Sequence, residues 1–370
     1  MKKILFITPF KLHKENMSNA AAANRISLII RGIAESSDSI IYSCADVSSE
    51  TKSIFLKSIL FILKYISILL KSYKYDFVYI YGEISIPLLK NLSKLFNIKI
   101  IVERCEFPNS LISQRKSNIL RKIMNYRFLN FLKNIDCFIT CSEALKIYYE
   151  NYTGSQCNTI IVPLIADIKK LESILLNGED YKDKSIAYCG SMGNNKDGVN
   201  ILIAAFALIH DKYPDYRLKL IGTASASEMD KLRQSVNELG ISLKVDFLGF
   251  LSHEKVIKEL QKSSILTLAR SSNKQAEGGI PSKLAEYLFA GVPTLVTNVG
   301  EIYKHVTDGK GCYMCEPDSE VLFAKKLEYI IQNYDDACII AQNGKKHAEL
   351  FDYKNQTFSI VNYINDTCEN

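Results

Sequence analysis

The segment that decides the fold is residues 265–306, with the sequence ILTLARSSNKQAEGGIPSKLAEYLFAGVPTLVTNVGEIYKHV. Its first residues, Ile265–Ala269, are almost all apolar and predict a buried strand. A polar loop follows, then a predicted helix from Ser282 to Ala290, and Pro293–Thr297 predicts a second strand. Gly291 suits the position just past a helix, because the backbone there is often left-handed. The segment therefore has the strand–helix–strand pattern of a parallel sheet.

The loop before this helix has the features of an anion-binding site. It contains Gly278, Gly279 and Ile280, and it ends at Pro281, a residue that suits the first turn of a helix. The backbone N–H groups of Ser282 and Lys283 would then point out of a helix N-terminus, where phosphate groups bind. Glu286 lies one turn further on, and a carboxylate beside a phosphate site can accept hydrogen bonds from ribose hydroxyls. These residues predict a nucleoside-diphosphate site.

Strand and helix patterns alternate twice along the chain, and 370 residues exceed the usual size of one hydrophobic core. Both halves contain short apolar runs separated by longer amphipathic stretches, as in parallel sheets covered by helices on both faces. The predicted strands are Ile4–Thr8, Phe77–Tyr81, Ile98–Glu103, Cys137–Thr140 and Thr159–Val162, then Ile186–Cys189, Leu218–Ile221, Val245–Leu248, Ile265–Leu268 and Thr294–Thr297. We therefore expect an α/β protein with two doubly wound, Rossmann-like domains.

Composition favours a globular protein in a reducing compartment, with 47% hydrophobic and 23% charged residues. No signal-peptide pattern follows Met1, and the longest apolar stretch, Ser58–Leu70, is too short to span a bilayer. Ten cysteines in such a chain favour free thiols. Cys312 and Cys315 form half of a zinc motif without a second pair, so we expect no metal site. The free thiols and the missing signal-peptide pattern favour a cytoplasmic location.

Positive charge is concentrated in the first part of the chain. Residues 1–168 contain 22 Lys and Arg against 13 Asp and Glu, a net charge of +9, whereas the remainder has a net charge of −3. Two basic, apolar helices are predicted at Thr51–Tyr75 and Arg115–Lys133. They are either solvated helices packed on the sheet or a docking surface for an anionic membrane. No nucleic-acid-binding motif accompanies the charge.

Residues Glu286-Tyr-Leu-Phe-Ala-Gly-Val-Pro293 resemble the C-terminal signature of the retaining GT-B glycosyltransferases of glycosyltransferase family 4. Those enzymes typically carry another glutamate eight positions earlier, where this chain has Gly278, and the nearest carboxylate is Glu277. The resemblance implies an acceptor-binding domain at residues 1–168 and a nucleotide-sugar-binding domain at residues 169–354. It also implies a C-terminal helix at residues 355–370 that crosses back to the first domain.

The resemblance extends to other site residues. Gly190, Ser191 and Lys196 resemble the loop in which the family places a diphosphate-binding lysine, although Ser191 stands where many relatives have an arginine. Gly249 lies in a turn like the one that lines the nucleobase pocket. Lys196 and Glu277 are thus candidate catalytic residues.

Three residues of the first domain are candidates for acceptor binding. Glu106 follows a predicted strand and could orient the acceptor hydroxyl, or it could be an ion-pair partner. Arg25 and Asn19 lie in or after the loop that follows the first strand, and Arg25 could equally be a surface residue.

The resemblance implies a transfer of a hexose-type sugar, with retention of configuration, from a nucleoside diphosphate to a hydroxyl of a saccharide. This acceptor would be lipid-linked, and the reaction would belong to surface polysaccharide biosynthesis. The absence of an Asp-x-Asp motif fits a metal-independent reaction without a cofactor. We expect the reaction to take place on the inner face of the plasma membrane. Two alternatives remain open, a non-hydrolysing sugar-nucleotide epimerase and a catalytically silent scaffold. A dehydrogenase is disfavoured, since Thr8-Pro9-Phe10 replaces the glycine-rich turn it would need.

Overall fold

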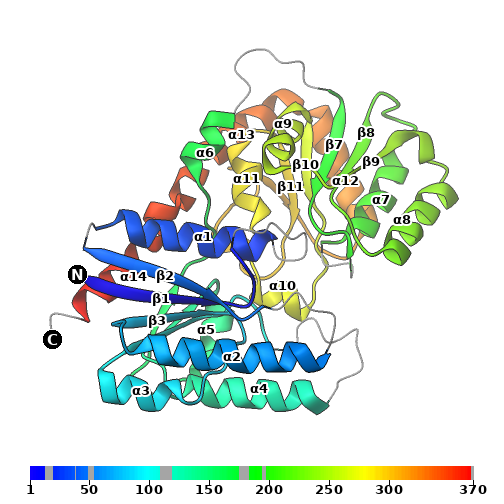
Figure 1. Ribbon diagram of the computed structural model, residues 1–370. Coiled ribbons are helices and arrows are strands. Elements are labelled where there is room, and N and C mark those ends of the chain that lie inside the picture. Colours follow the sequence, from blue (N-terminus) through cyan, green and yellow to red (C-terminus); the bar gives the residue numbers. More distant parts are fainter. Residues whose placement is uncertain are drawn as a thin grey trace. The chain divides into compact units, whose positions relative to one another are not determined.

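The computed structural model describes residues 1–12, 20–37, 39–48, 54–108, 119–174, 183–193 and 197–367. The chain forms two compact units, one made of Met1–Ile165 and Tyr353–Asn370 and the other of Ala166–Asp352. The family resemblance predicts these boundaries after residues 168 and 354. Both units are α/β structures built on a parallel sheet (Figure 1).

The first unit has a six-stranded sheet in the order β2-β1-β3-β4-β5-β6, and every neighbouring pair is parallel. Its strands are β1 (Lys2–Thr8), β2 (Ile40–Asp46), β3 (Phe77–Tyr81), β4 (Lys99–Glu103), β5 (Cys137–Thr140) and β6 (Asn158–Ile161). Its helices are α1 (Ala20–Glu35), α2 (Ile54–Ser72), α3 (Leu89–Phe96), α4 (Ile119–Leu132), α5 (Glu143–Glu150) and α14 (Tyr353–Asp366).

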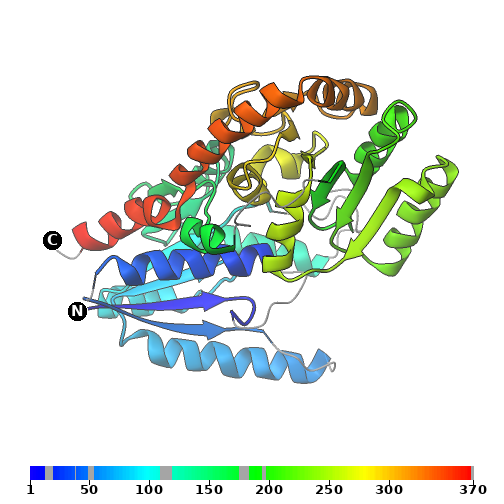
Figure 2. The same cartoon turned by 90° about the horizontal axis from the view of Figure 1, so that it is seen from above.

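Helices cover both faces of this sheet. One core contains residues of α1 and α14, such as Ile29 and Ile360, and the other contains residues of α2, α4 and α5, such as Ile68, Phe128 and Leu145. Helix α14 lies beside α1 (Figure 2), and the side-chain amine of Lys2 donates to the carbonyl of Ile364 over 3.1 Å. The C-terminal helix thus returns to the first unit, as expected.

The second unit has its own parallel sheet in the order β12-β11-β10-β7-β8-β9. Its strands are β7 (Ser185–Cys189), β8 (Arg217–Ile221), β9 (Val245–Gly249), β10 (Ile265–Leu268), β11 (Thr294–Thr297) and β12 (Tyr313–Cys315). Its helices are α6 (Ile168–Ile174), α7 (Val199–Ile209), α8 (Ala226–Glu238), α9 (His253–Lys262), α10 (Lys274–Gly278), α11 (Lys283–Phe289), α12 (Glu320–Gln332) and α13 (Tyr334–Ala348). The strand order reverses direction between β7 and β10, which is where open α/β sheets bind ligands.

Two strands and one helix escaped the sequence analysis. Edge strand β2 is mostly exposed and lacks a continuous apolar run, and edge strand β12 has only three residues. The loop expected after β10 contains the short helix α10, which Asn273 caps by accepting from the N–H of Ala276 over 3.0 Å. Pro281 precedes the N-cap residue Ser282 instead of occupying the first helical turn. Gly291 has φ of +66°, in line with the expected end of α11.

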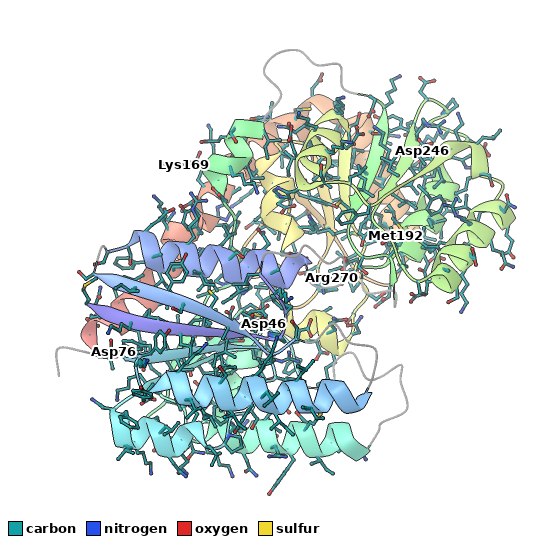
Figure 3. All side chains as sticks on the ribbon, viewed as in Figure 1. Asp46, Asp76, Lys169, Met192, Asp246 and Arg270 are labelled. Atoms are coloured by element: carbon teal, nitrogen blue, oxygen red, sulfur yellow. The ribbon has the colours of Figure 1, made fainter. Side chains whose placement is uncertain are left out.

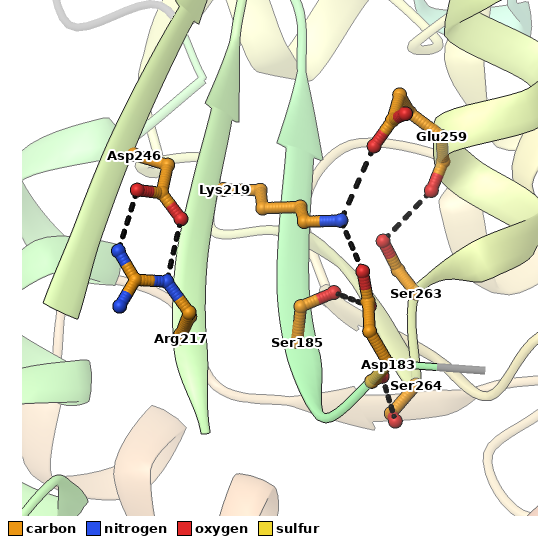
Figure 4. Close-up of polar contacts among 8 residues, drawn as sticks. All are labelled: Asp183, Ser185, Arg217, Lys219, Asp246, Glu259, Ser263 and Ser264. Carbon is orange, nitrogen blue, oxygen red and sulfur yellow. Dashed lines mark hydrogen bonds and ion pairs between the residues drawn. The ribbon is translucent and has the colours of Figure 1, made fainter. Parts of the chain in front are cut away.

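A polar network ties the amino-terminal ends of β7, β8 and β9 together (Figure 4). The amine of Lys219 bonds to Asp183 and lies 3.2 Å from the carboxylate of Glu259. Arg217 on β8 makes two hydrogen bonds, of 2.8 and 2.6 Å, to the carboxylate of Asp246 on β9. Each of these charged groups has a partner of opposite charge. The network lies at the end of the sheet opposite the loops that follow the strands, so we assign it a role in stability.

Candidate functional site

The candidate site lies at the carboxyl-terminal ends of the strands in the second unit. β7 leads into the loop that contains Gly190, Ser191 and Met192, and β10 leads directly to Arg270. Figure 3 labels Met192 and Arg270, one from each of these loops. Since β7 and β10 are neighbours at the switch point, both loops border the region where such sheets bind ligands.

Helix α11 is fixed to this edge by a tyrosine. The hydroxyl of Tyr287 accepts from the backbone N–H of Cys189 at the end of β7, over 2.7 Å, and its side chain is fully buried. Leu284 and Leu288 are also buried, so they form the packed face of the helix that the sequence predicts. Glu286 therefore has a fixed position beside the end of β7.

Glu286 is the centre of a charged cluster. One of its carboxylate oxygens accepts from the amine of Lys283 over 2.8 Å, and the other lies 3.3 Å from Nε2 of His253, the first residue of α9. Only 11% of the Glu286 side chain is exposed. Burial alone would raise the pKa of this carboxyl, but Lys283 and His253 outweigh it and lower the pKa to about 2.

Glu286 is thus an ionised, nearly buried carboxylate at neutral pH. Each carboxylate oxygen can accept more than one hydrogen bond, so the ion pair leaves capacity for sugar hydroxyls. Burial would lower the pKa of Lys283, but the charge of Glu286 outweighs it and raises that pKa, so the amine stays cationic. The Nδ1 atom of His253 is buried and has no hydrogen-bond partner among the described residues. A ligand hydroxyl, carbonyl or phosphate oxygen would suit these groups.

Arg270 connects the loops around this cluster. Its side chain is 3% exposed, and its Nε lies 3.3 Å from the carboxylate of Asp197 in the loop after β7. Its Nη1 donates to the carbonyl of Gly279, in the turn before α11, over 3.1 Å. Asp197 also accepts from the hydroxyl of Tyr188 over 3.0 Å. One buried guanidinium therefore holds both loops in place.

Gly198 allows the loop after β7 to lie against β10. It has φ of +64°, and a Cβ atom there would lie 1.8 Å from the carbonyl oxygen of Ala269. Other residues rarely adopt this backbone conformation, so the close approach requires glycine. Lys196 precedes Asp197 and lies outside the described residues, so its role stays a prediction. Asp197 and Gly198, which follow Lys196 in the chain, are held in place by Arg270 and by this packing against Ala269.

The other predicted donor-binding residues occupy the same edge of the sheet. Gly190 follows β7, the carbonyl of Ser191 accepts from Tyr188 over 2.8 Å, and Gly249 ends β9. Gly278, Gly279, Ile280 and Ser282 connect α10 to α11. Because α11 has only seven residues, its dipole adds little, and the cation of Lys283 is the stronger attraction for an anion.

Glu277 is the predicted residue that this cluster does not include. It lies in α10 with an exposed side chain, which makes no hydrogen bond or ion pair with the residues that the structure describes. Its proposed catalytic role stays a prediction.

In the first unit, Arg25 takes part in a buried ion pair. Its Nε donates to the carboxylate of Glu103 over 2.6 Å, and its two terminal nitrogens donate to the carbonyls of Pro163 and Val162 over 2.9 and 2.5 Å. Tyr79 donates to the other oxygen of Glu103 over 2.6 Å. Arg25 is therefore not a surface residue, and it ties α1 to the ends of β4 and β6. Acceptor binding by Arg25 stays a prediction, and Asn19 lies outside the described residues.

Glu106 lies near a second arginine of the first unit. Its carboxylate is 3.9 Å from Arg104, whose guanidinium is bonded to Glu83 over 2.5 Å. The backbone carbonyl of Glu106 accepts from Tyr149 over 2.8 Å. The side chain of Glu106 is partly exposed, so it has an ion-pair partner and can also reach a ligand.

No sequence motif identifies a role for His253, Asp197 or Arg270. Each of them follows a strand of the second unit, and this position is the signal that could have identified them. Isolated polar residues after strands are common, however, and only the folded structure shows that Arg270 bonds to two loops.

The comparisons with known proteins agree with this architecture. Residues 175–347 match the model of the family described as glycosyl transferases group 1. The chain has the fold of the sucrose-phosphate synthase from Thermosynechococcus elongatus, with a TM-score of 0.77 at 14% identity over all of both chains. It is also similar to the Anabaena protein HepE, solved in complex with UDP, with a TM-score of 0.73 at 16% identity over 99% of this chain and 100% of the other.

Two curated proteins are similar in sequence over part of the chain. The D-inositol 3-phosphate glycosyltransferase of Corynebacterium urealyticum is 22% identical over 62% of this chain and 56% of its own length. A Campylobacter jejuni α-1,4-N-acetyl-D-galactosaminyltransferase is 24% identical over 69% of this chain and 68% of its own length. The first match thus spans little more than half of the corynebacterial protein.

The fold and the site define a two-domain, Rossmann-like protein of the GT-B type. The chain is similar to the GT-B glycosyltransferases, and its match to the group 1 family covers residues 175–347, which make up most of the second unit.

Proposed function

We propose that this protein transfers a hexose-type sugar from a nucleoside diphosphate to a hydroxyl group of a saccharide. The second unit binds the donor and the first unit binds the acceptor. The solved relative HepE is described in complexes with UDP and with UDP-glucose, which supports a nucleotide-sugar donor. The Campylobacter relative is named for a saccharide linked to undecaprenol diphosphate, which supports a lipid-linked acceptor. A place in surface polysaccharide biosynthesis, at the cytoplasmic face of the membrane, is part of the same proposal.

The observation that carries the proposal is the cluster of Glu286, Lys283 and His253. The ionised carboxylate of Glu286 accepts hydrogen bonds from the ribose hydroxyls, and charged hydrogen bonds are about twice as strong as neutral ones. The amine of Lys283 lies 2.8 Å from that carboxylate and attracts the diphosphate. An anionic group and a cationic group side by side match a ribose joined to a phosphate.

The chemistry follows from where charge develops. As the bond between the sugar and the diphosphate breaks, its electron pair passes to the diphosphate oxygen, and negative charge grows there. Lys283 and Lys196 stabilise this charge electrostatically. The acceptor hydroxyl forms the new bond on the side that the diphosphate leaves, and a phosphate oxygen takes its proton, so the sugar retains its configuration. The proposal includes no metal, and no cluster of three or more His, Cys, Asp or Glu suited to a metal occurs among the described residues.

The test is donor binding and turnover with a panel of UDP-, GDP- and CMP-sugars. We expect one nucleotide to bind, and Glu286→Gln to weaken that binding at least tenfold. Glu320→Gln is the matched control, because Glu320 is an exposed glutamate in the first turn of α12 in the same unit. No binding of any nucleotide would contradict the donor site. Nucleotide binding without turnover for any acceptor would favour the silent scaffold.

A further inference from the structure

Helix α2 in the first unit presents an apolar face to solvent. On a helix of a soluble protein, the apolar face normally packs against the core and the polar face points outward. In α2 the residues that contact the core are Ile68, with Tyr65 and Leu69 packed beside it. The outward residues are also apolar, and 57% of Leu63 and 67% of Leu70 are exposed. We call these outward residues the apolar stripe: Ile59, Ile62, Leu63, Ile66 and Leu70.

Exposed apolar side chains continue on the two neighbouring helices of the same face. On α3 they are Leu95 and Phe96, and the ring of Phe96 lies 5.7 Å from the ring of Tyr73, which follows α2. On α4 they are Ile123 and Met124. Figure 1 shows α2, α3 and α4 in one layer of the first unit. Large exposed apolar side chains gathered on neighbouring helices are typical of an interaction site.

The charges on these three helices have a single sign. Helices α2, α3 and α4 contain eight Lys or Arg and no Asp or Glu. Lys64 is used internally, since its amine bonds to Asp46 over 2.8 Å. The exposed cations with described side chains include Lys71, Lys94, Lys122 and Arg127. Apolar side chains flanked by cations match the interior and the head groups of an anionic lipid surface.

We propose that the layer of α2, α3 and α4 docks on an anionic membrane and inserts the apolar stripe among the lipids. A second copy of this chain is a poorer occupant, because a symmetric contact would place the cations of one copy against those of the other. No helix among the described residues is long and apolar enough to cross a membrane. The contact is therefore with one leaflet. The sequence left two alternatives for the basic helices, membrane docking or solvated helices packed on the sheet. The exposed apolar residues of α2 favour membrane docking.

The first experiment uses the fact that the chain contains no tryptophan. Leu63→Trp places a single fluorophore in the apolar stripe, and Leu243→Trp places one at an exposed site of the second unit as a control. We expect vesicles of phosphatidylcholine with phosphatidylglycerol to shift the emission of Leu63→Trp to shorter wavelength, and brominated lipid to quench it. Leu243→Trp should not respond. No shift for Leu63→Trp, or equal shifts for both variants, would overturn the proposal.

The second experiment separates the apolar and the ionic parts in a vesicle flotation assay. Ile62→Gln, Leu63→Gln and Ile66→Gln together should weaken binding at least tenfold, because they remove buried hydrocarbon from the contact. The same change at Leu208, Leu243 and Ile339, exposed residues of the second unit, should have no effect. Equal binding of both triple variants would overturn insertion by the stripe.

The ionic arm changes Lys71, Lys94 and Lys122 to Gln, with Lys231, Lys255 and Lys310 of the second unit as matched exposed controls. Each cation near an anionic surface strengthens binding about fivefold, so the three changes should weaken it on the order of a hundredfold at low salt. Binding should fall for the wild type at high salt, where charges are screened. Equal binding to pure phosphatidylcholine would contradict the anionic requirement.

These binding assays need neither donor nor turnover, so they succeed or fail independently of the proposed transfer reaction. Circular dichroism checks that each variant is folded. If the wild type ignores both kinds of vesicle and self-associates, and the stripe variant abolishes that association, the face is a contact between copies and the membrane proposal is wrong.

Discussion

Replacing Glu286 by Gln should destabilise the second unit as well as weaken donor binding. The substitution keeps the shape of the side chain but removes the charge that faces Lys283 and His253. Lys283 is left without its anionic partner in a site where its side chain is only 28% exposed. A partly buried cation without a partner loses hydration that nothing replaces.

The size of the effect follows from the pKa of Glu286, which the folded site lowers from 4.5 to about 2. One pKa unit corresponds to about 1.4 kcal/mol, so the shift corresponds to about 3 kcal/mol of stability at pH 7. Removing one partner of a buried ion pair typically costs about 3–5 kcal/mol, which is a similar range. We therefore expect Glu286→Gln to lower the free energy of unfolding by about 3 kcal/mol.

The sign of the pH dependence is also determined. A carboxyl whose pKa is lowered by folding contributes stability above its unfolded pKa and loses it as the pH falls toward the folded value. The difference between wild type and Glu286→Gln should therefore be constant above about pH 5 and shrink between about pH 4.5 and pH 2. Tyrosine fluorescence and far-ultraviolet circular dichroism in urea, at pH 7 and near pH 3.5, measure this difference.

Glu320→Gln serves as the control, because Glu320 is exposed in the same unit. A Glu286→Gln variant as stable as the control at pH 7 would refute the ion-pair argument. A stability difference that does not change with pH would show that lost shape or packing, and not charge, causes it. If stability falls as expected but nucleotide affinity does not, the cluster is structural and the donor site lies elsewhere.

Three further changes have expected outcomes. Lys196→Ala should lower kcat by about two to three orders of magnitude, because charge on the leaving diphosphate grows in the transition state; a rise in KM alone would limit Lys196 to ground-state binding, and a strict need for Mg²⁺ or Mn²⁺ in the wild type would contradict the metal-free proposal. Arg25→Met leaves Glu103 buried and unpaired, so urea unfolding should show a free energy of unfolding lower by about 3–5 kcal/mol. Unchanged stability would show that the ion pair makes no net contribution to stability. Gly198→Ala should destabilise the loop after β7 by at least about 1–3 kcal/mol, since its backbone is left-handed and the Cβ meets the carbonyl of Ala269; a wild-type melting temperature would contradict that close contact.

The sequence predicts the buried strands well because their pattern is local. Phe77–Tyr81, Cys137–Thr140 and Ile265–Leu268 are continuous apolar runs, and the structure has strands with these same bounds. Strand β2 is mostly exposed and lacks a continuous apolar run, and its pairing with β1 is what makes it a strand. Sequence patterns contain little information about such pairing.

The site shows the same division between local and distant information. Glu286 and Lys283 are close in sequence, and helical spacing brings them together. His253 reaches Glu286 from the start of α9, and Arg270 links the loops around the cluster, so only the folded sheet brings these residues together. The spacing also placed Glu286 off the packed face of α11, whereas the neighbouring loops bury most of its side chain.

The return of α14 to the first unit makes that unit discontinuous in the chain, while Ala166–Asp352 is one uninterrupted segment. All of the second unit therefore emerges from the ribosome before the helix that covers one face of the first sheet. Until Tyr353–Asp366 emerges, core residues of α1 such as Ile29 have no α14 to pack against. The nascent first half is thus a client for chaperones for longer than the second, and removal of the last eighteen residues should impair folding of the half that was synthesised first.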